Sequence, residues 1–470
     1  MAESAGRLSS YDTAGGRKAR SIQPCETVTY EFLVSRRSDG VGRASSNSVQ
    51  GITANLTRGV ALTVLIGFFS VLGHAQEPSD PNATPWANSP SMFGDWGGER
   101  TRLANLGLTF SFISVNDFLV NEKGGDANWS RVRGTADFNF GKAELLPGLT
   151  FHITGLWQAG GNMGAYIGSS ANPSSLVSAN TARLDSWWFE QALLNNKLFV
   201  RLGQFAGLDF YGVQDDGASY VLEPLGYAIG NLFPADHESF DPAGTPAAEI
   251  RIVPSRHFYW KGAVFSGNRN PYQDDPNGFH FRFKDSPVVA TEIGYNFDPT
   301  SSPGVKSWPG TYKLGATINP GQFSNIVTGA QSKTNYLVYV MANQRIYRPD
   351  AGSDRGLEVN FAFDWTPGEF TRNYSQVTGG FRYHGLIPHR ERDTVSVGVV
   401  YTRISPALDQ AYADAGLPLF GGEKAVEVNY ALKVTRWFTF QPVFQYYFDT
   451  GANPYGHNSV VAGFRTSFSL

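Results

Sequence analysis

The sequence predicts an all-β protein: a transmembrane antiparallel β-barrel of about 16 strands, with a short periplasmic helix near its N-terminus. Three observations predict this fold. Apolar and polar residues alternate with a period of two in many segments. No stretch beyond residue 75 offers the roughly 18 consecutive apolar residues of a helical span. Aromatic residues, 14% of the chain, gather at the ends of the alternating segments, as in the girdles of membrane barrels.

The N-terminal region divides into three parts before the barrel. Residues 1–50 form a polar extension, which is either a long targeting segment or, as we favour, the product of a start codon placed too early. Residues 51–75 are interpreted as a signal peptide. Residues 76–92 form a flexible leader rich in Pro and Asn. We assign the barrel domain to residues 93–470.

The signal peptide is predicted from its charge, its apolar core and the small residues that follow. Arg58 precedes an apolar run over residues 59–73, and Gly73 and Ala75 suit cleavage after about Ala75. A signal anchor or a buried helix is the alternative interpretation. The only cysteine, Cys25, lies upstream, so the mature chain would have no disulfide, no cysteine-bound zinc and no thiol nucleophile.

Three segments show the alternation most clearly. Apolar side chains occupy the odd positions of 357–365 and mostly the even positions of 426–434 and 460–470. Successive side chains of a strand point to opposite faces, so each segment has one apolar and one polar face. Both a soluble sandwich and a membrane barrel need such strands. Segment lengths of about 9–11 residues favour the barrel, because average soluble strands have about 5–6.

The alternation breaks over residues 205–248. An irregular stretch of this length inside a compact domain is usually functional. We expect it to fold into or over the barrel and to narrow the pore. A solvated extracellular loop is the alternative.

A glycine-rich motif opens the barrel domain. It includes Gly94, Asp95, Trp96, Gly97, Gly98, Arg100 and Arg102. The glycines permit tight turns around Trp96. Residues 99–106 have a helix-forming composition, and Gly107 is a suitable stop. This helix could pack at the periplasmic mouth or serve as an ordinary cap without effect on transport.

The motif and the segment after it, residues 93–110, resemble the opening signature of the carbohydrate-selective porin family, the OprB-like outer-membrane porins. Later segments such as 198–205 and 312–317 resemble that family less specifically. The resemblance implies a barrel of about 16 strands in the bacterial outer membrane. It also implies passive diffusion of monosaccharides past a charged constriction. One departure is the last residue, because such proteins typically end in Phe and this chain ends in Leu470.

The polar strand faces are assigned to the lumen, because Arg or Lys facing lipid would cost about 2–4 kcal/mol at the bilayer midplane. The predicted pore-lining and substrate-contacting residues are Arg201, Glu249, Arg251, Lys261, Glu292, Glu358, Asp364, Arg382, Lys433 and Arg465. A lumen with both charge signs suits neutral sugars, since these side chains donate to and accept from hydroxyl groups. Alternatively, each charge only pairs with a neighbour and keeps the wall hydrated.

Two other functions stay open: a porin for other small solutes such as anions, and a hydrolase embedded in a barrel. The sequence contains no nucleophile motif of the G-x-S-x-G type, and we expect no enzyme activity, cofactor or metal. The net charge of −3 does not suggest nucleic acid. The expected partners are small sugars, outer-membrane lipid, the barrel-assembly machinery and, as an open question, further copies of the chain.

Overall fold

The computed structural model describes residues 86–227, 243–268, 271–297, 308–350 and 353–470. The chain divides into two compact units, Met1–Gln50 and Gly51–Leu470, and every described residue lies in the second. The predicted polar extension, the signal peptide and most of the leader therefore lie outside the described residues.

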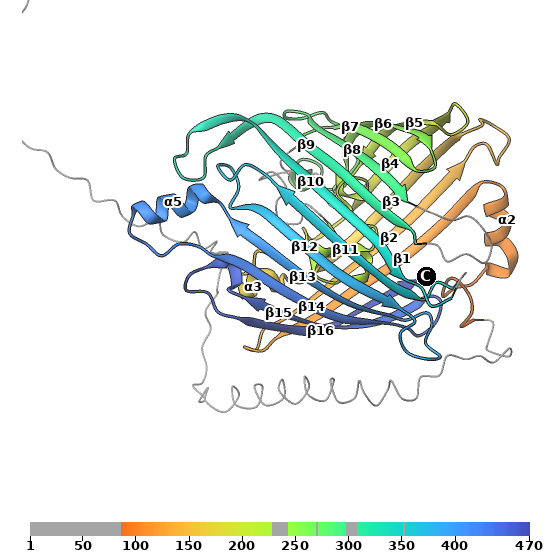
Figure 1. Cartoon of the computed structure of the whole chain (residues 1–470). Helices are drawn as coiled ribbons and strands as arrows, with labels where there is room; N and C mark the ends of the chain where they lie inside the picture. Colours follow the sequence, from red (N-terminus) through yellow and green to blue (C-terminus); the bar gives the residue numbers. More distant parts are fainter. Residues whose placement is uncertain (1–85, 228–242, 269–270, 298–307, 351–352) are drawn as a thin grey trace, which may run out of the picture. The chain divides into compact units, whose positions relative to one another are not determined.

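Sixteen strands form the wall of the second unit. They are β1 (Leu108–Asn121), β2 (Asp126–Asn139), β3 (Leu149–Gly160), β4 (Thr181–Leu193), β5 (Leu198–Phe205), β6 (Thr245–Ser255), β7 (Phe258–Phe265), β8 (Val288–Phe297), β9 (Gly310–Ser324), β10 (Gln331–Tyr347), β11 (Gly356–Trp365), β12 (Asn373–His384), β13 (Thr394–Ile404), β14 (Gly422–Lys433), β15 (Phe438–Phe448) and β16 (Ser459–Ser469). Each strand pairs antiparallel with its neighbours in sequence, and β1 also pairs with β16 (Figure 1). The pairing closes the barrel, so the predicted fold class is confirmed and the sandwich alternative was wrong.

Strand facing agrees with the alternation. On β11, the outward side chains of Phe361 and Phe363 are 46% and 37% exposed. The alternate residues Ala362 and Asp364 are only 2% and 0% exposed. On this strand apolar residues therefore face outward, and small or polar residues face inward. Strand lengths vary more than predicted, from 8 residues in β5 to 17 in β10.

The aromatic residues predicted to form the girdle at the strand ends are Trp365, Tyr383, Tyr401, Trp437 and the run 446–448, and the prediction is wrong for two of them. Tyr401 and Phe448 are exposed on the outer face, but Trp437 and Tyr447 are buried. Trp437 precedes β15 and packs on Trp86, with ring centroids 4.5 Å apart. Tyr447 follows the inward parity of its strand, and its hydroxyl donates to Gln445 Oε1 at 3.1 Å. An aromatic residue at a strand end is therefore not by itself a lipid contact.

Short helices lie in the connections. They are η1 (Trp96–Gly98), α2 (Glu99–Asn105), α3 (Met163–Ile167), η2 (Gly207–Asp209), η3 (Gly217–Ser219), η4 (Glu223–Leu225), α4 (Pro271–Asp274), α5 (Pro406–Asp414) and η7 (Thr450–Ala452). None of the described helices has the length and apolar character needed to cross a membrane. Helix α2 matches the expected N-terminal helix to within one residue.

The opening motif joins α2 to the first strand. Gly94, Gly97 and Gly98 have φ of +65°, +70° and +99°, the left-handed region that favours glycine. Arg100 Nη2 donates to the carbonyl of Phe110 on β1 at 2.9 Å. The motif thus has a structural role at the entry to the barrel.

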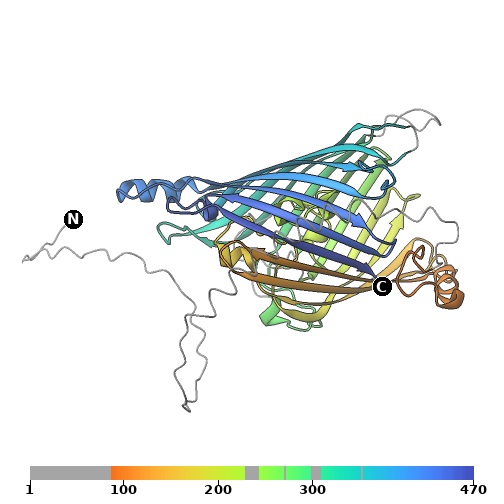
Figure 2. The same ribbon diagram turned by 90° about the horizontal axis from the view of Figure 1, so that it is seen from below.

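Both ends of the described chain meet at one end of the barrel. The N–H of Met92 donates to the carbonyl of Ser469 at 2.8 Å, and the N–H of Leu470 donates to the carbonyl of Phe112 at 2.8 Å. Figure 2 shows the C-terminus beside the segment that leads into β1. We call this the terminal end and the opposite one, which carries α5, the loop end.

Candidate functional site

All ten predicted pore-lining residues lie on barrel strands at inward positions. They are Arg201 on β5, Glu249 and Arg251 on β6, Lys261 on β7, Glu292 on β8, Glu358 and Asp364 on β11, Arg382 on β12, Lys433 on β14 and Arg465 on β16. The structure does not bring them into one site. Seven fall into three charged sets on neighbouring strands, and three stand apart.

The first set lies on β4, β5 and β6. Arg201 Nη2 is 2.6 Å from Glu190 Oε2, and Arg201 Nη1 is 3.2 Å from Glu249 Oε1. Arg251 Nη2 is 3.1 Å from Glu190 Oε1. Glu190 therefore bridges two arginines. The sequence did not reveal it, because the run Trp187–Phe189 hides the alternation of β4.

The second set centres on Glu292. Lys261 Nζ lies 2.9 Å from Glu292 Oε1, and the hydroxyls of Tyr259 and Tyr339 donate to the same carboxylate at 2.7 Å each. A Cβ at Gly315 would lie 2.1 Å from the ring of Tyr339. The missing side chain at this position lets the tyrosine lie along the inner wall.

The third set is a row across three strands. Arg345, Glu358 and Arg382 are register partners on β10, β11 and β12. Arg345 Nε donates to Glu358 Oε1 at 2.7 Å, and Arg382 pairs with Glu358 Oε2. Arg382 also forms an ion pair with Asp216, which lies outside the strands. The second cation of the row, Arg345, was not predicted.

The other three predicted residues stand apart. Arg465 Nε donates to Asp117 Oδ1 at 2.6 Å. Lys433 Nζ donates to the hydroxyl of Thr439 at 2.9 Å. Asp364 is fully buried, and neither carboxylate oxygen has a hydrogen-bond partner within the part of the chain that the structure describes.

The connection after β5 folds into the lumen. Residues 206–227, which we call the inward segment, carry η2, η3 and η4. The N–H of Gly212 donates to Glu292 Oε2 at 3.3 Å, and Lys313 Nζ donates to the carbonyl of Val213 at 2.9 Å. The described part of the irregular stretch thus takes the predicted inward path. The predicted end at residue 248 was wrong, since β6 already begins at Thr245.

A second connection, residues 161–180 between β3 and β4, also turns inward, which the sequence did not predict. The N–H of Ser175 donates to the carbonyl of Val221 at 2.8 Å, and the N–H of Glu223 donates to the carbonyl of Asn172 at 3.0 Å. Met163 and Ala171 join a buried cluster with residues of the inward segment and of the wall. The two connections therefore form one packed body inside the barrel.

Asp216 is a carboxyl group of the inward segment whose pKa is shifted. Burial raises the pKa of its carboxyl to about 6, against the lowering effect of Arg382. The carboxylates of Glu358 and Asp215 add to the raised pKa. Asp216 is therefore a titratable group near neutral pH on a segment that touches the wall.

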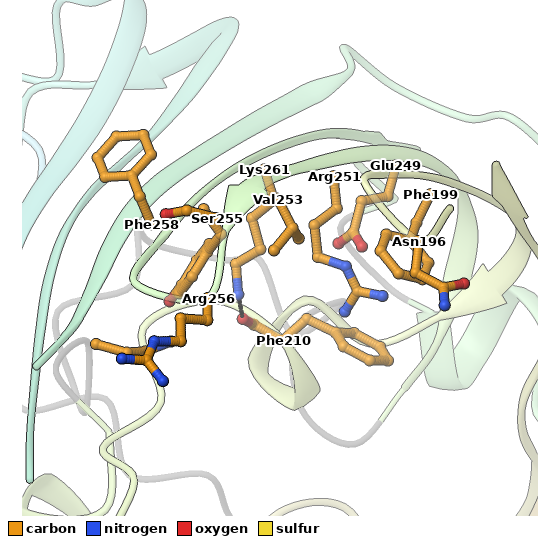
Figure 3. Close-up of a pocket in the computed structure, with 12 residues that line it drawn as sticks. Asn196, Phe199, Phe210, Glu249, Arg251, Val253, Ser255, Arg256, Phe258 and Lys261 are labelled. Atoms are coloured by element: carbon orange, nitrogen blue, oxygen red, sulfur yellow. Dashed lines mark hydrogen bonds between the residues drawn. The ribbon is translucent and has the colours of Figure 1, made fainter. Parts of the chain in front are cut away.

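The described lumen contains a cavity of about 390 Å³ between the inward segment and the wall of β5–β8. In Figure 3, Phe210 of the inward segment forms its floor, and Arg251, Glu249 and Lys261 reach toward it from the strands. Lys261 donates to the carbonyl of Phe210. A smaller cavity of about 140 Å³ lies beside Asp216, Arg345, Glu358 and Arg382. Among the described residues, no three His, Cys, Asp or Glu side chains gather as a metal site.

Comparison with known families identifies the barrel. The family model described as "Carbohydrate-selective porin, OprB family" matches residues 123–470, which is most of the chain. The chain belongs to the OprB family of carbohydrate-selective porins. The resemblance expected from the opening motif is thereby confirmed, although the matched residues begin after that motif.

Similar proteins agree with this family. Porin B of Pseudomonas aeruginosa is 23% identical over 434 residues, which cover 83% of this chain and 92% of that protein. A high-pH structure of OprB from Pseudomonas putida has a TM-score of 0.73 at 20% identity, covering 82% of this chain and 99% of that one. A low-pH structure of the same protein has a TM-score of 0.55 at 18% identity, with coverages of 82% and 99%. At these identities the solved structures support the fold alone.

Membership of the OprB family makes the chain a sugar-selective porin of the outer membrane. Proteins of this family and fold are channels. The charged sets line the inside of the barrel, and the inward segment contacts all three, through Phe210 on Arg201, Gly212 on Glu292 and Asp216 on Arg382. The loop end carries the longer connections, as expected for the extracellular side, so the terminal end is assigned to the periplasm.

Proposed function

We propose that this porin lets monosaccharides diffuse passively into the periplasm, and that the inward segment forms its constriction. The observation that carries the proposal is the 390 Å³ cavity, where the inward segment meets the charged wall. Its volume falls at the lower end of the range of about 300–1,000 Å³ that small-molecule sites occupy. A single sugar ring is a solute of suitable size.

The chemistry of the cavity supports a sugar rather than an ion. The guanidinium of Arg251 lies 4.2 Å from the ring centroid of Phe199, and both side chains line the cavity. Aromatic rings cover the apolar C–H faces of a pyranose, and a guanidinium N–H can donate to a hydroxyl. Contacts of this kind are few, which suits a channel from which the solute must leave.

The paired charges argue against strong anion selectivity. The cations on this wall form ion pairs with carboxylates on nearby strands. The cations are Arg201, Arg251 and Lys261, and the carboxylates are Glu190, Glu249 and Glu292. An anion pore would need an excess of cations along its path. The same reasoning supports a channel without catalytic activity, because these carboxylates serve as partners of arginine and lysine.

Liposome swelling with a panel of sugars and amino acids tests the proposal, with Arg382→Ala as the informative variant. Swelling should be faster with a hexose than with a disaccharide or an amino acid of similar size. Removing Arg382 leaves Asp216 and Glu358 without a shared cation. Loss of one partner from a buried ion pair costs about 3–5 kcal/mol, enough to displace the inward segment. We expect Arg382→Ala to admit the disaccharide and to raise conductance.

Arg382→Lys is the matched control, because it keeps the charge while losing the guanidinium fork. It should fall between the wild type and the alanine variant. If sugar flux and ion selectivity are unchanged in Arg382→Ala, this arginine is only a wall charge. If the wild type swells equally fast with all solutes of one size, the proposed sugar preference is wrong.

We further propose that the protein reaches the outer membrane as a cleaved precursor. Arg58, the apolar run 59–73 and the small residue at Ala75 motivate a mature chain that begins near Gln76. N-terminal sequencing of protein from the outer-membrane fraction should read from about Gln76. Residues 1–50 intact in that fraction would contradict the proposal. We propose three kinds of partner for the mature protein: outer-membrane lipid, the barrel-assembly machinery and further copies of the same chain.

A further inference from the structure

Glu427 on β14 is a wall carboxylate that binds two consecutive backbone amides of the inward segment. It is fully buried. Its Oε1 accepts the N–H of Val221 at 2.9 Å, and its Oε2 accepts the N–H of Leu222 at 2.6 Å. Each carboxylate oxygen thus holds one of two consecutive backbone amides. Hydrogen bonds to an ionised acceptor are about twice as strong as bonds between neutral groups.

Two wall side chains complete the coordination of this carboxylate. Gln445 Nε2 donates to Glu427 Oε2 at 2.9 Å, and Asn429 Nδ2 donates to Glu427 Oε1 at 2.7 Å. Four N–H donors therefore surround one buried charge. Asn429 Nδ2 also donates to the carbonyl of Ser219 at 2.9 Å, so the same wall patch binds the inward segment a third time.

The wall next to Glu427 lacks side chains where the inward segment lies. Gly380 on β12 and Gly398 on β13 are register partners, and Gly398 is the register partner of Glu427. A Cβ at Gly380 would lie 2.5 Å from the hydroxyl of Tyr220, and one at Gly398 would lie 2.4 Å from Leu225 Cδ1. The glycines form a shallow seat, and Glu427 binds the backbone that occupies it.

Residues 220–225 of the inward segment and the connection 161–180 fill the lumen beside β13–β16 and β1, since their buried cluster includes the wall residues Leu119, Val400, Ala425, Val443 and Val461. Both described cavities are lined by residues from the opposite part of the wall, between the β4–β5 turn and β12, and by the inward segment itself. The attachment at Glu427 therefore fixes residues 220–225 on one side of the barrel, while residues 210–216 of the same segment contact the opposite wall, where both cavities lie.

We propose that Glu427 is the positioning residue that seats the inward segment and so sets the width and position of the pore. This inference rests on the function proposed above, in which that segment forms the constriction. The four hydrogen-bond partners of Glu427 among the described residues line neither cavity, so Glu427 acts on the solute through the position of the inward segment. Its loss is expected to change selectivity while the barrel stays closed.

The first test replaces Glu427 by Gln, which keeps the shape but turns one acceptor into an N–H that faces a backbone donor. Glu427→Gln should raise single-channel conductance and lose the discrimination between a hexose and a disaccharide in liposome swelling. Lys424→Gln is the control on the same strand, because Lys424 is exposed and pairs only at 3.6 Å with Asp449. It should behave as the wild type in both measurements.

A second test removes the contact from the side of the segment. Leu222 has φ −63°, which proline can adopt, so Leu222→Pro deletes the amide that Glu427 accepts. Leu222→Ala removes a similar amount of side chain but keeps the amide. We expect the disaccharide to pass faster through Leu222→Pro than through Leu222→Ala.

Assembly is checked in each variant by the shift in gel mobility between unheated and boiled protein, since a closed barrel has no edge from which to unzip. Glu427→Gln that assembles with unchanged conductance and discrimination would overturn the inference, as would equal flux through the two Leu222 variants. If the wild type shows no discrimination between sugars, the proposed function fails. In that case single-channel conductance still tests whether Glu427 positions the inward segment, because only this role predicts that Glu427→Gln widens the pore.

Discussion

Replacing Phe361 by Arg is expected to prevent the barrel from assembling in the outer membrane. Phe361 lies in the middle of β11, and 46% of its surface is exposed on the outer, lipid-facing side. An arginine at the bilayer midplane of a barrel costs about 2–4 kcal/mol. The folded variant should be depleted from the outer-membrane fraction, and the remaining protein should lose the mobility difference between unheated and boiled samples.

Phe361→Leu is the matched control, because it keeps the outer face apolar and should assemble normally. Arg382→Ala, one strand away and facing inward, should also assemble, since it removes a charge from the lumen and adds none to the lipid face. Normal assembly of Phe361→Arg together with failed assembly of Arg382→Ala would mean that the strands face the opposite way. The three variants thus test strand facing independently of transport.

The strands could be predicted because a membrane barrel imposes one local rule on the sequence. A side chain faces either lipid or lumen, and the choice alternates along each strand. The rule worked wherever the alternation was unbroken, as on β11 and β16. It missed β4, where Trp187 and Trp188 are consecutive large aromatics, and with it the carboxylate of Glu190.

The partners of each inward charge could not be predicted in the same way. Glu427 is recognisable as a lumen residue, but its partners Val221 and Leu222 lie about 200 positions away and offer only backbone amides. Backbone donors leave no trace in a sequence. Gly398 shows the same limit, because its role appears only when Leu225 is seen in the space above it.

The sequence pattern predicted one of the two inward connections but none of its contacts. The break in alternation at the inward segment indicated a functional connection, and the described residues 206–227 lie against the wall as expected. The second inward connection, residues 161–180, has a similar break but was not singled out. Its packing depends on Asp117 and Glu423, which accept hydrogen bonds from Ser174 and Ala171 respectively. These contacts join parts of the chain that are distant in sequence.

Lowering the pH from 7.5 to 5 is expected to favour the seated form of the inward segment and to reduce conductance and sugar flux. Burial raises the pKa of Asp216 to about 6 in the seated segment, whereas a displaced, hydrated carboxyl would return to its usual value of 3.8. The seated form therefore binds a proton more tightly, so acidification through pH 6 stabilises it and a rise in pH weakens it. Between these two pH values the ratio of seated to displaced segment should change about tenfold, or about 1.4 kcal/mol.

Asp216→Asn assigns this pH dependence to the proposed residue. The amide imitates the protonated carboxyl, so the variant should show the low conductance at both pH values and lose the step near pH 6. The charges around Asp216 are Arg382, Glu358 and Asp215, and His384 Nε2 lies 4.0 Å from Glu358. A variant that keeps the full step would assign the titration to one of these neighbours. Single-channel recordings at pH 5, 6 and 7.5 in the two proteins decide between Asp216 and its neighbours, because only titration of Asp216 itself disappears in Asp216→Asn.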